Sequence, residues 1–126
     1  LAPKESKVVI LGLTFKENCP DIRNSKVGDI LRRLQEYNVK PIVVDPCADF
    51  EEAKQIYGVN LSKLPTVQNA NCIIIAVAHE EFKVMSLEDI DKIYADVDNS
   101  KKVLLDVKGI FNLGELKETG YRFWRL

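Results

Sequence analysis

Short runs of apolar residues alternate along this chain with segments of helical spacing, and this alternation constrains the fold more than any other feature. The first run, 7–12, ends at a glycine, as expected of a strand that is buried on both faces of a parallel sheet. Further runs follow at 39–45, 72–78, 102–107 and, more weakly, 121–126. Strands that alternate with helices imply right-handed crossovers and a parallel sheet with helices on both faces. We therefore predict a Rossmann-like, three-layer α/β domain whose mainly parallel sheet has about five strands.

The segments between these runs supply the expected helices. Between the first two runs, apolar residues recur with the i, i+3, i+4, i+7 spacing of one helix face. They are Val27, Ile30, Leu31, Leu34 and Tyr37. Ser25 is expected to cap the start of this helix, and Asn38 to end it. Similar patterns predict helices over 49–57, 86–94 and 112–118.

The composition excludes several classes of protein. A chain of 126 residues suits one domain, and its 46% apolar and 29% charged residues argue against disorder and against a coiled coil. Because 18 Lys and Arg balance 19 Asp and Glu, no overall field would attract nucleic acid or anionic lipid. The longest apolar run, 72–78, is too short to cross a bilayer. We expect a protein with no nucleic-acid and no membrane partner, which holds any anion at a local site.

The start of the sequence suggests that the chain is a piece of a longer polypeptide. It has no signal peptide and does not begin with methionine, since its only methionine is Met85. We expect residues 1–7 to be the end of a linker and residues 8–126 to form the domain.

The three cysteines indicate a reducing, cytoplasmic setting. Cys19, Cys47 and Cys72 have neither the spacing of a metal site nor the density of a disulfide scaffold, so no metal is predicted. Cys19 lies between Lys16 and Arg23, which could make its thiol reactive. No partner for catalysis can be placed beside it, and a catalytic role is not favoured. Cys47 and Cys72 are interpreted as ordinary loop and strand cysteines.

The segment after the first predicted strand, 12–25, is long for a loop between a strand and a helix, which usually has about 2 to 6 residues. Extra length there suggests function, because ligands of such folds bind beyond the carboxyl ends of the strands. The loop lacks the G-x-G-x-x-G of a dinucleotide site, since Thr14 and Glu17 occupy two of the glycine positions. It offers instead Lys16 and Arg23 near a helix N-terminus, a combination that suits phosphate.

Each candidate residue has a structural alternative. Lys16 and Arg23 could be solvated or could pair with acidic neighbours in the loop, Glu17 and Asp21. Lys108, which follows the fourth predicted strand, could add a third positive charge or be a plain surface lysine.

Two further polar residues follow the middle strands. Asp45 could hold a ribose hydroxyl, but it lies too far from Gly12 for the usual spacing and precedes Pro46, so a role in a turn is favoured. His79 could act as an acid or base at the ligand edge. No nucleophile pattern accompanies it, and a helix-start or surface position is favoured.

The loop also carries a resemblance. Residues 12–25 read G-L-T-F-K-E-N-C-P-D-I-R-N-S, which resembles the G-L-x-F-K-x-x-x-x-D-x-R-x-S signature of the UDP-glucose/GDP-mannose dehydrogenase family, at the start of its C-terminal, UDP-binding domain. Three later segments agree with the family in order. They are Val44-Asp45-Pro46, His79-Glu80-Glu81-Phe82 and Asp106-Val107-Lys108-Gly109. The loop is most similar to the branch that oxidises UDP-N-acetylhexosamines to uronic acids for surface polysaccharides.

The resemblance implies a parent enzyme of three parts: an N-terminal NAD-binding domain, a central helical dimerisation region and this UDP-sugar-binding domain. Such enzymes oxidise the sugar C6 alcohol to a carboxylate in two NAD-dependent steps, through a cysteine in a G-G-x-C-x-P motif that is missing here. The parent is therefore expected to be a homodimeric, NAD-dependent nucleotide-sugar dehydrogenase, whereas this chain alone should be inactive and hold no catalytic residue.

By the same resemblance, Phe15, Lys16 and Lys108 are expected to bind the substrate, and Arg23 to reach NAD bound mainly by the N-terminal domain. Many family members have an arginine pair where this chain has Lys108 and Gly109. A lysine there would act as a point charge and not as a bidentate fork. Two alternatives remain open: a UDP-glucose 6-dehydrogenase that makes UDP-glucuronate, and a Rossmann-like nucleotide-binding module without redox activity.

Overall fold

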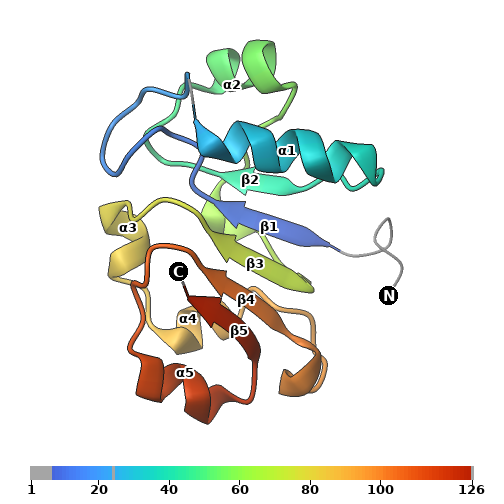
Figure 1. Ribbon diagram of the computed structural model, residues 1–126, viewed down its shortest axis with the longest axis vertical. Coiled ribbons are helices and arrows are strands. Elements are labelled where there is room, and N and C mark those ends of the chain that lie inside the picture. The colour runs from blue at the N-terminus through green and yellow to red at the C-terminus, as the bar shows by residue number, and fades with distance from the viewer. Residues whose placement is uncertain (1–6, 24, 126) are drawn as a thin grey trace.

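The computed structural model describes residues 7–23 and 25–125 and confirms the predicted α/β fold. Five strands form one sheet in the order β2-β1-β3-β4-β5, and every neighbouring pair is parallel. The strands are β1 (Val8–Leu11), β2 (Ile42–Val44), β3 (Cys72–Ile75), β4 (Val103–Asp106) and β5 (Arg122–Arg125). Their carboxyl ends share one edge, on the left in Figure 1. Strand order reverses beside β1, the place where open α/β sheets bind ligands.

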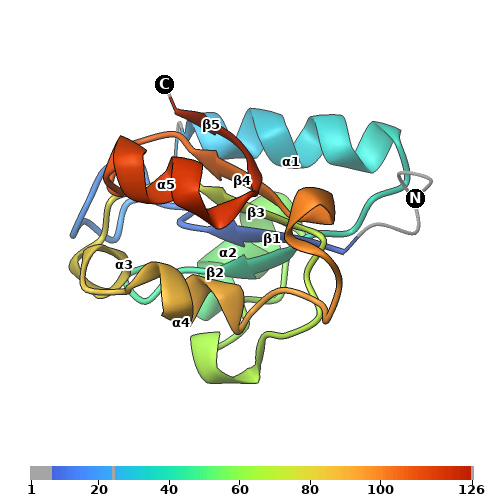
Figure 2. The same ribbon diagram turned by 90° about the horizontal axis from the view of Figure 1, so that it is seen from below.

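Helices cover both faces of this sheet, as predicted. One face packs against α1 (Lys26–Glu36) and α2 (Phe50–Tyr57), and the other against α3 (Glu80–Lys83), α4 (Leu87–Asp91) and α5 (Leu113–Thr119). Figure 2 shows α1 and α4 on opposite sides of the sheet. Two single turns of 3-10 helix, η2 (Leu64–Thr66) and η3 (Asn99–Lys101), precede β3 and β4. Within the described residues, no helix is long and apolar enough to span a membrane.

The two ends predicted for α1 are confirmed. The Ser25 side chain accepts a hydrogen bond from the Val27 N–H at 3.1 Å and caps α1, and Asn38 ends that helix with a left-handed φ of 60°. The helices α2 and α5 begin at side-chain caps and end at left-handed glycines. These pairs are Asp49 with Gly58, and Asn112 with Gly120.

The elements differ from the prediction mainly in length. The strands predicted over 39–45 and 72–78 are shorter, and the helix predicted over 86–94 ends at Asp91. The sequence pattern also missed α3, because a single helical turn is too short to show a period. The predicted linker, residues 1–7, lies outside the described residues except for Lys7. Asn24 and Leu126 also lie outside the described residues.

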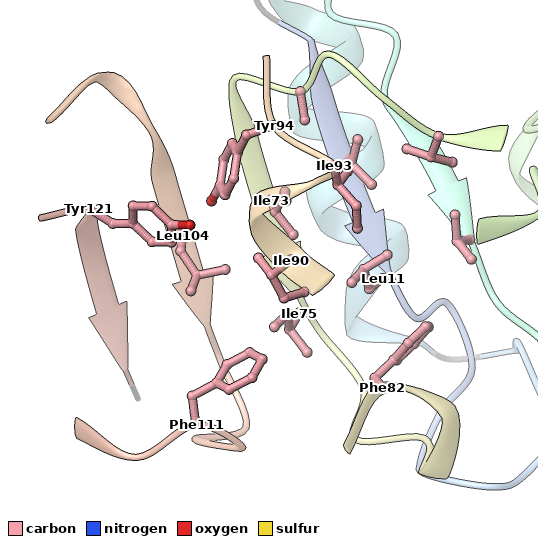
Figure 3. Packing of buried hydrophobic residues seen from close by; sticks show 14 of the residues in the cluster. Leu11, Ile73, Ile75, Phe82, Ile90, Ile93, Tyr94, Leu104, Phe111 and Tyr121 are labelled. Atoms are coloured by element: carbon pink, nitrogen blue, oxygen red, sulfur yellow. The ribbon is translucent and has the colours of Figure 1, made fainter. Parts of the chain in front are cut away.

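Two apolar clusters form the core, one on each face of the sheet. Figure 3 shows part of the larger cluster, where alternate strand residues meet side chains of α3, α4 and the segment before α5. Its labelled members are Leu11, Ile73, Ile75, Phe82, Ile90, Ile93, Tyr94, Leu104, Phe111 and Tyr121. On the other face, Ile10 and Ile74 pack with Val27 and Leu31 of α1. Each fully buried side chain of this size contributes about 1.5–3 kcal/mol to the free energy of folding. The sheet is therefore stable enough to hold the loops at its edge in place.

The predicted terminal strand is present as β5 and pairs with β4, but its aromatic side chains are unequally buried. Tyr121 is buried and Phe123 packs against the larger cluster, whereas Trp124 is 56% exposed. Trp124 points to the opposite face from Phe123 because side chains alternate along a strand, and β5 is the edge of the sheet.

Candidate functional site

The loop after β1, residues 12–25, starts at a glycine that the sheet requires. Gly12 has a φ of 109°, and a Cβ at this position would lie 2.6 Å from the Cβ of Val77. The Gly12 N–H also donates to the carbonyl of Val44 at 2.8 Å, so the chain is confined between neighbouring strand ends as it leaves the sheet. A side chain would force the loop away from this edge.

Asp45, the residue after β2, is buried and holds the start of that loop. Its Oδ2 accepts the N–H groups of Leu13 at 2.6 Å and Thr14 at 3.0 Å, and its Oδ1 accepts those of Cys47 at 2.8 Å and Ala48 at 3.0 Å. Burial opposes ionisation of the carboxyl, but the hydrogen bonds donated to it, first that of Leu13, hold its pKa below the ordinary value. The predicted role in a turn is confirmed, and both carboxylate oxygens are engaged within the protein.

His79, which follows β3, is completely buried and joins the same network. The Asn18 N–H donates to its Nδ1 at 2.9 Å, so Nδ1 carries a lone pair and the ring proton sits on Nε2. Nε2 lies 2.9 Å from both Oδ2 of Asp45 and Oγ1 of Thr14. The Thr14 hydroxyl in turn donates to the carbonyl of Lys16 at 3.0 Å. The predicted helix-start position is confirmed, because His79 immediately precedes α3, but a surface position is wrong.

Asp45, Cys47 and His79 are of the types that bind metals, and their ligand atoms lie within 4.8 Å of one another. The lone pairs of the Asp45 carboxylate and of Nδ1 of His79 are already engaged by backbone N–H groups, as described above. The Cys47 Sγ lies 3.6 Å from Nδ1 of His79, and burial, followed by the nearby charges of Asp45 and Glu81, raises the pKa of this thiol. The thiol therefore stays protonated at neutral pH, and the cluster serves as a hydrogen-bonding network.

The binding residues predicted in the loop lie on its outer part. Phe15, Lys16 and Arg23 are all exposed, Phe15 at 58%. The Phe15 N–H donates to the Asp21 carbonyl at 2.6 Å and closes the loop. Within residues 7–23 and 25–125, neither cation forms an ion pair. Of the two structural alternatives, solvation is therefore the one observed, which leaves both cations available to an anion.

The N-terminus of α1 contributes less to an anion site than the sequence suggests. Buried Ser25 accepts the Val27 N–H with its side chain and the Gly28 N–H with its carbonyl, at 3.1 Å each. Asp29 adds a negative charge to the first turn. An anion at this edge would thus rely on the cationic side chains of the loop.

Lys108 follows β4 on the same edge of the sheet, but β3 separates its strand from β1. It is exposed and stands in a turn built by Asp106, whose carboxylate is buried and accepts the N–H groups of Ile110 and Phe111, both at 3.0 Å. The structure therefore places Lys108 at the predicted edge without bringing its strand next to β1.

A groove of 390 Å³ beside Asp45 is a feature that sequence reasoning missed. It is mostly apolar, and its walls come from the start of α2, the segment before η2 and α3, so no local pattern could have indicated it. Its lining residues are Val44, Asp45, Pro46, Ala48, Phe50, Leu61, Ser62, Lys63, Leu64, Glu81 and Phe82.

Comparison with known proteins explains why this loop and these strand ends occur together. Residues 9–113 match the model of the UDP-glucose/GDP-mannose dehydrogenase family, UDP binding domain. The chain belongs to this family. The resemblance seen in the loop signature is thereby confirmed, and the matched part of this UDP-binding domain includes the loop, Asp45, His79 and Lys108.

Two curated relatives and one crystal structure define its neighbours. The domain is 46% identical over 103 residues to a UDP-N-acetyl-D-glucosamine 6-dehydrogenase of Pseudomonas aeruginosa, covering 82% of this chain and 24% of that enzyme. It is 33% identical over 122 residues to a UDP-N-acetyl-D-mannosamine dehydrogenase of Methanocaldococcus jannaschii, covering 95% of this chain and 26% of that enzyme. An NDP-N-acetyl-D-galactosaminuronic acid dehydrogenase of Methanosarcina mazei shares the fold, with a TM-score of 0.79 at 19% identity over 98% of this chain and 25% of that structure. The chain thus spans about a quarter of its relatives' length.

Proposed function

We propose that this chain is the UDP-sugar-binding domain of an NAD-dependent UDP-sugar 6-dehydrogenase that converts a UDP-N-acetylhexosamine into its uronate for surface polysaccharide synthesis. The names of the Pseudomonas and Methanocaldococcus enzymes, both N-acetylhexosamine dehydrogenases, support this substrate class. The observation that carries the proposal is the loop 12–25, whose cations are exposed while its base is fixed by buried hydrogen bonds. The parent enzyme would be a cytoplasmic homodimer.

In this proposal the loop binds the charged part of the substrate. Lys16 and Arg23 donate charge-assisted hydrogen bonds to anionic groups, the lysine to the diphosphate and the arginine toward NAD. Phe15 offers an exposed ring that can pack on an apolar face of the ligand. Lys108 supplies a further positive charge from the same edge. Holding the diphosphate orients the attached sugar for reaction elsewhere in the enzyme.

NAD does not fit this loop as a resident of the domain. A dinucleotide cradle needs glycines where the backbone approaches the diphosphate, and Thr14 stands at one of these positions with its side chain buried and hydrogen-bonded. Glu17 stands at another and adds a negative charge. We therefore propose that the parent's other domains hold NAD, the hydride acceptor, and that this chain contributes Arg23 alone.

Titration with UDP tests the site in this chain directly. UDP added to the ¹⁵N-labelled chain should shift the backbone amide signals of the loop 12–25. Lys16→Ala should weaken the affinity by about 10- to 150-fold, since a charge-assisted hydrogen bond is worth about 1.5–3 kcal/mol. Lys40→Ala is the matched control, because Lys40 is an exposed lysine just before β2, at the opposite edge of the sheet. Equal effects of the two variants would reject the assigned site.

Substrate choice is tested in the parent polypeptide. Reduction of NAD should be observed with a UDP-N-acetylhexosamine and be much slower with UDP-glucose. Faster turnover of UDP-glucose would establish the alternative UDP-glucose 6-dehydrogenase. If no UDP-sugar supports NAD reduction, a nucleotide-binding module without redox activity becomes the better description.

A further inference from the structure

We propose that His79 and Asp45 are positioning residues that set the place of Lys16 for the phosphate groups of the substrate. This inference rests on the proposed function, because it concerns the same loop. It assigns a purpose to a histidine and a carboxylate whose side chains have no surface exposed to solvent.

The imidazole of His79 holds the loop on both sides of Lys16. Its Nε2 contacts Oγ1 of Thr14, two residues before the lysine, and its Nδ1 accepts the N–H of Asn18, two residues after it, both at 2.9 Å. The Thr14 hydroxyl donates to the carbonyl of Lys16 itself at 3.0 Å. The backbone that carries the Lys16 ammonium is therefore fixed by one side chain from another strand.

Asp45 fixes the imidazole in turn. Its Oδ2 lies 2.9 Å from Nε2 of His79 and accepts the N–H groups of Leu13 and Thr14 as well. The carboxylate thus selects the tautomer with a proton on Nε2, which is the tautomer whose Nδ1 can accept the Asn18 N–H. If Nδ1 carried a proton, it would face the Asn18 N–H, which is also a donor. The hydrogen bond that holds the second half of the loop would then be lost.

Asn18 completes this arrangement from the loop side. It has a left-handed φ of 56°, which turns the chain back toward the sheet. Its Oδ1 accepts the N–H of Glu80 at 3.1 Å, at the start of α3. The loop and the helix that begins after His79 therefore hold each other in register.

The geometry favours positioning over proton transfer. The side chain of His79 has no exposed surface, and both ring nitrogens are occupied by protein groups. Lys16 is exposed to solvent, whereas His79 is buried. A lysine on a fixed backbone loses less freedom when it binds an anion, so the network should raise affinity by preorganisation.

A double-mutant cycle on UDP affinity tests this assignment, with Lys16→Ala, His79→Phe and the double variant in the ¹⁵N-labelled chain. His79→Phe should weaken UDP binding several-fold. If His79 acts through Lys16, the double variant should bind UDP no more weakly than Lys16→Ala alone. Additive losses, or full affinity in His79→Phe, would overturn the inference. If Lys16→Ala itself leaves the affinity unchanged, the proposed function fails instead.

A milder variant and a control separate positioning from loss of stability. Thr14→Val keeps the side-chain shape but removes the hydroxyl between His79 and Lys16. If His79→Phe does not fold, Thr14→Val takes its place in the cycle, and the same non-additivity with Lys16→Ala is expected. Ser86→Ala removes the cap of α4, away from the loop, and should lower stability while UDP affinity is unchanged. The ¹⁵N signals of the ring should show a protonated Nε2 and a bare Nδ1 at neutral pH. A protonated Nδ1 would contradict the network.

Discussion

The Nε2 atom of His79 lies 2.9 Å from Oδ2 of Asp45, and neither side chain has any surface exposed to solvent. The two residues follow β3 and β2, the strands on either side of β1. One buried contact thus joins strand ends that flank the loop 12–25. Any change in the charge of this carboxylate should be felt both in stability and in that loop.

Acid should destabilise the domain through Asp45. The pKa of Asp45 in the folded chain lies below the ordinary value of 3.8. Between the folded and the unfolded pKa the unfolded chain therefore binds more protons, and stability rises with pH. The contribution of the carboxylate is complete above about pH 5 and is lost as the pH falls through the folded pKa. Urea unfolding at a series of pH values measures this loss as a falling midpoint.

Asp45→Asn provides the comparison. It should lower the free energy of unfolding at neutral pH by about 2 kcal/mol or more and should flatten the acid slope, since an amide cannot accept all of these N–H groups. Where this variant does not fold, the ¹³C signal of the Asp45 carboxyl gives the titration directly. A titration midpoint of the Asp45 carboxyl at or above the ordinary pKa of 3.8 would contradict the network.

Gly28→Ala should destabilise α1, although alanine normally favours a helix interior by about 1 kcal/mol over glycine. A Cβ at Gly28 would lie 2.6 Å from Cε1 of Tyr57. That ring is held in place because its hydroxyl donates to the Ile22 carbonyl at 2.5 Å. Displacing it should cost about 1–3 kcal/mol, measured as a lower urea midpoint. In a Tyr57→Leu background the cost should largely disappear, and an equal cost there would refute this explanation.

Cys72 should react slowly with alkylating reagents. Burial raises the pKa of its thiol from 9.0 to about 11, so near pH 8 its thiolate fraction is about a hundredth of that of an ordinary cysteine. Mass spectrometry of the chain treated with iodoacetamide measures the rate at each cysteine. Labelling of Cys72 as fast as that of free glutathione would contradict the prediction.

Lys102→Met should destabilise the end of the sheet opposite the loop. The buried ammonium donates to Oδ1 of Asp91 at 2.9 Å and to Oδ1 of Asn99 at 2.8 Å, and it lies 5.7 Å from the ring centre of Tyr94. Methionine keeps the apolar stem but removes these interactions, at a cost of about 1–2 kcal/mol in the free energy of unfolding. The neighbouring exposed Lys101→Met is the matched control and should change stability by less than about 0.5 kcal/mol. Equal effects of the two changes would show that the buried contacts contribute nothing.

The fold could be predicted from sequence because its signals are local. Apolar runs indicated the strands, periodic residues indicated the helix α1, and the cap Ser25 indicated a helix start that the structure confirms. The site could be predicted only in part. The length of the loop and the positions of Lys16 and Arg23 can be read from the sequence. Because the loop follows a predicted strand, the sequence also indicates the edge of the sheet at which these cations lie.

The remainder depends on contacts between distant residues. Nothing near His79 in the sequence indicates that it is buried against Asp45, because the partners belong to different strands. The groove beside Asp45 likewise has walls from separate segments. The substrate and NAD roles of Phe15, Lys16, Lys108 and Arg23 remain predictions, to be tested as described above.

Thr14 and His79 are 65 residues apart in the sequence, and Leu13 and Asp45 are 32 apart, yet these pairs give the loop its shape. Contacts of such separation form only after the intervening chain has been ordered, which makes them late events in folding. A chain interrupted before β3 would still contain the complete loop signature but would lack His79, which contacts both Thr14 and Asn18. The loop motif is therefore complete in the chain before the His79 contacts that the proposed UDP site needs. Retention on immobilised UDP would report that the sheet has assembled.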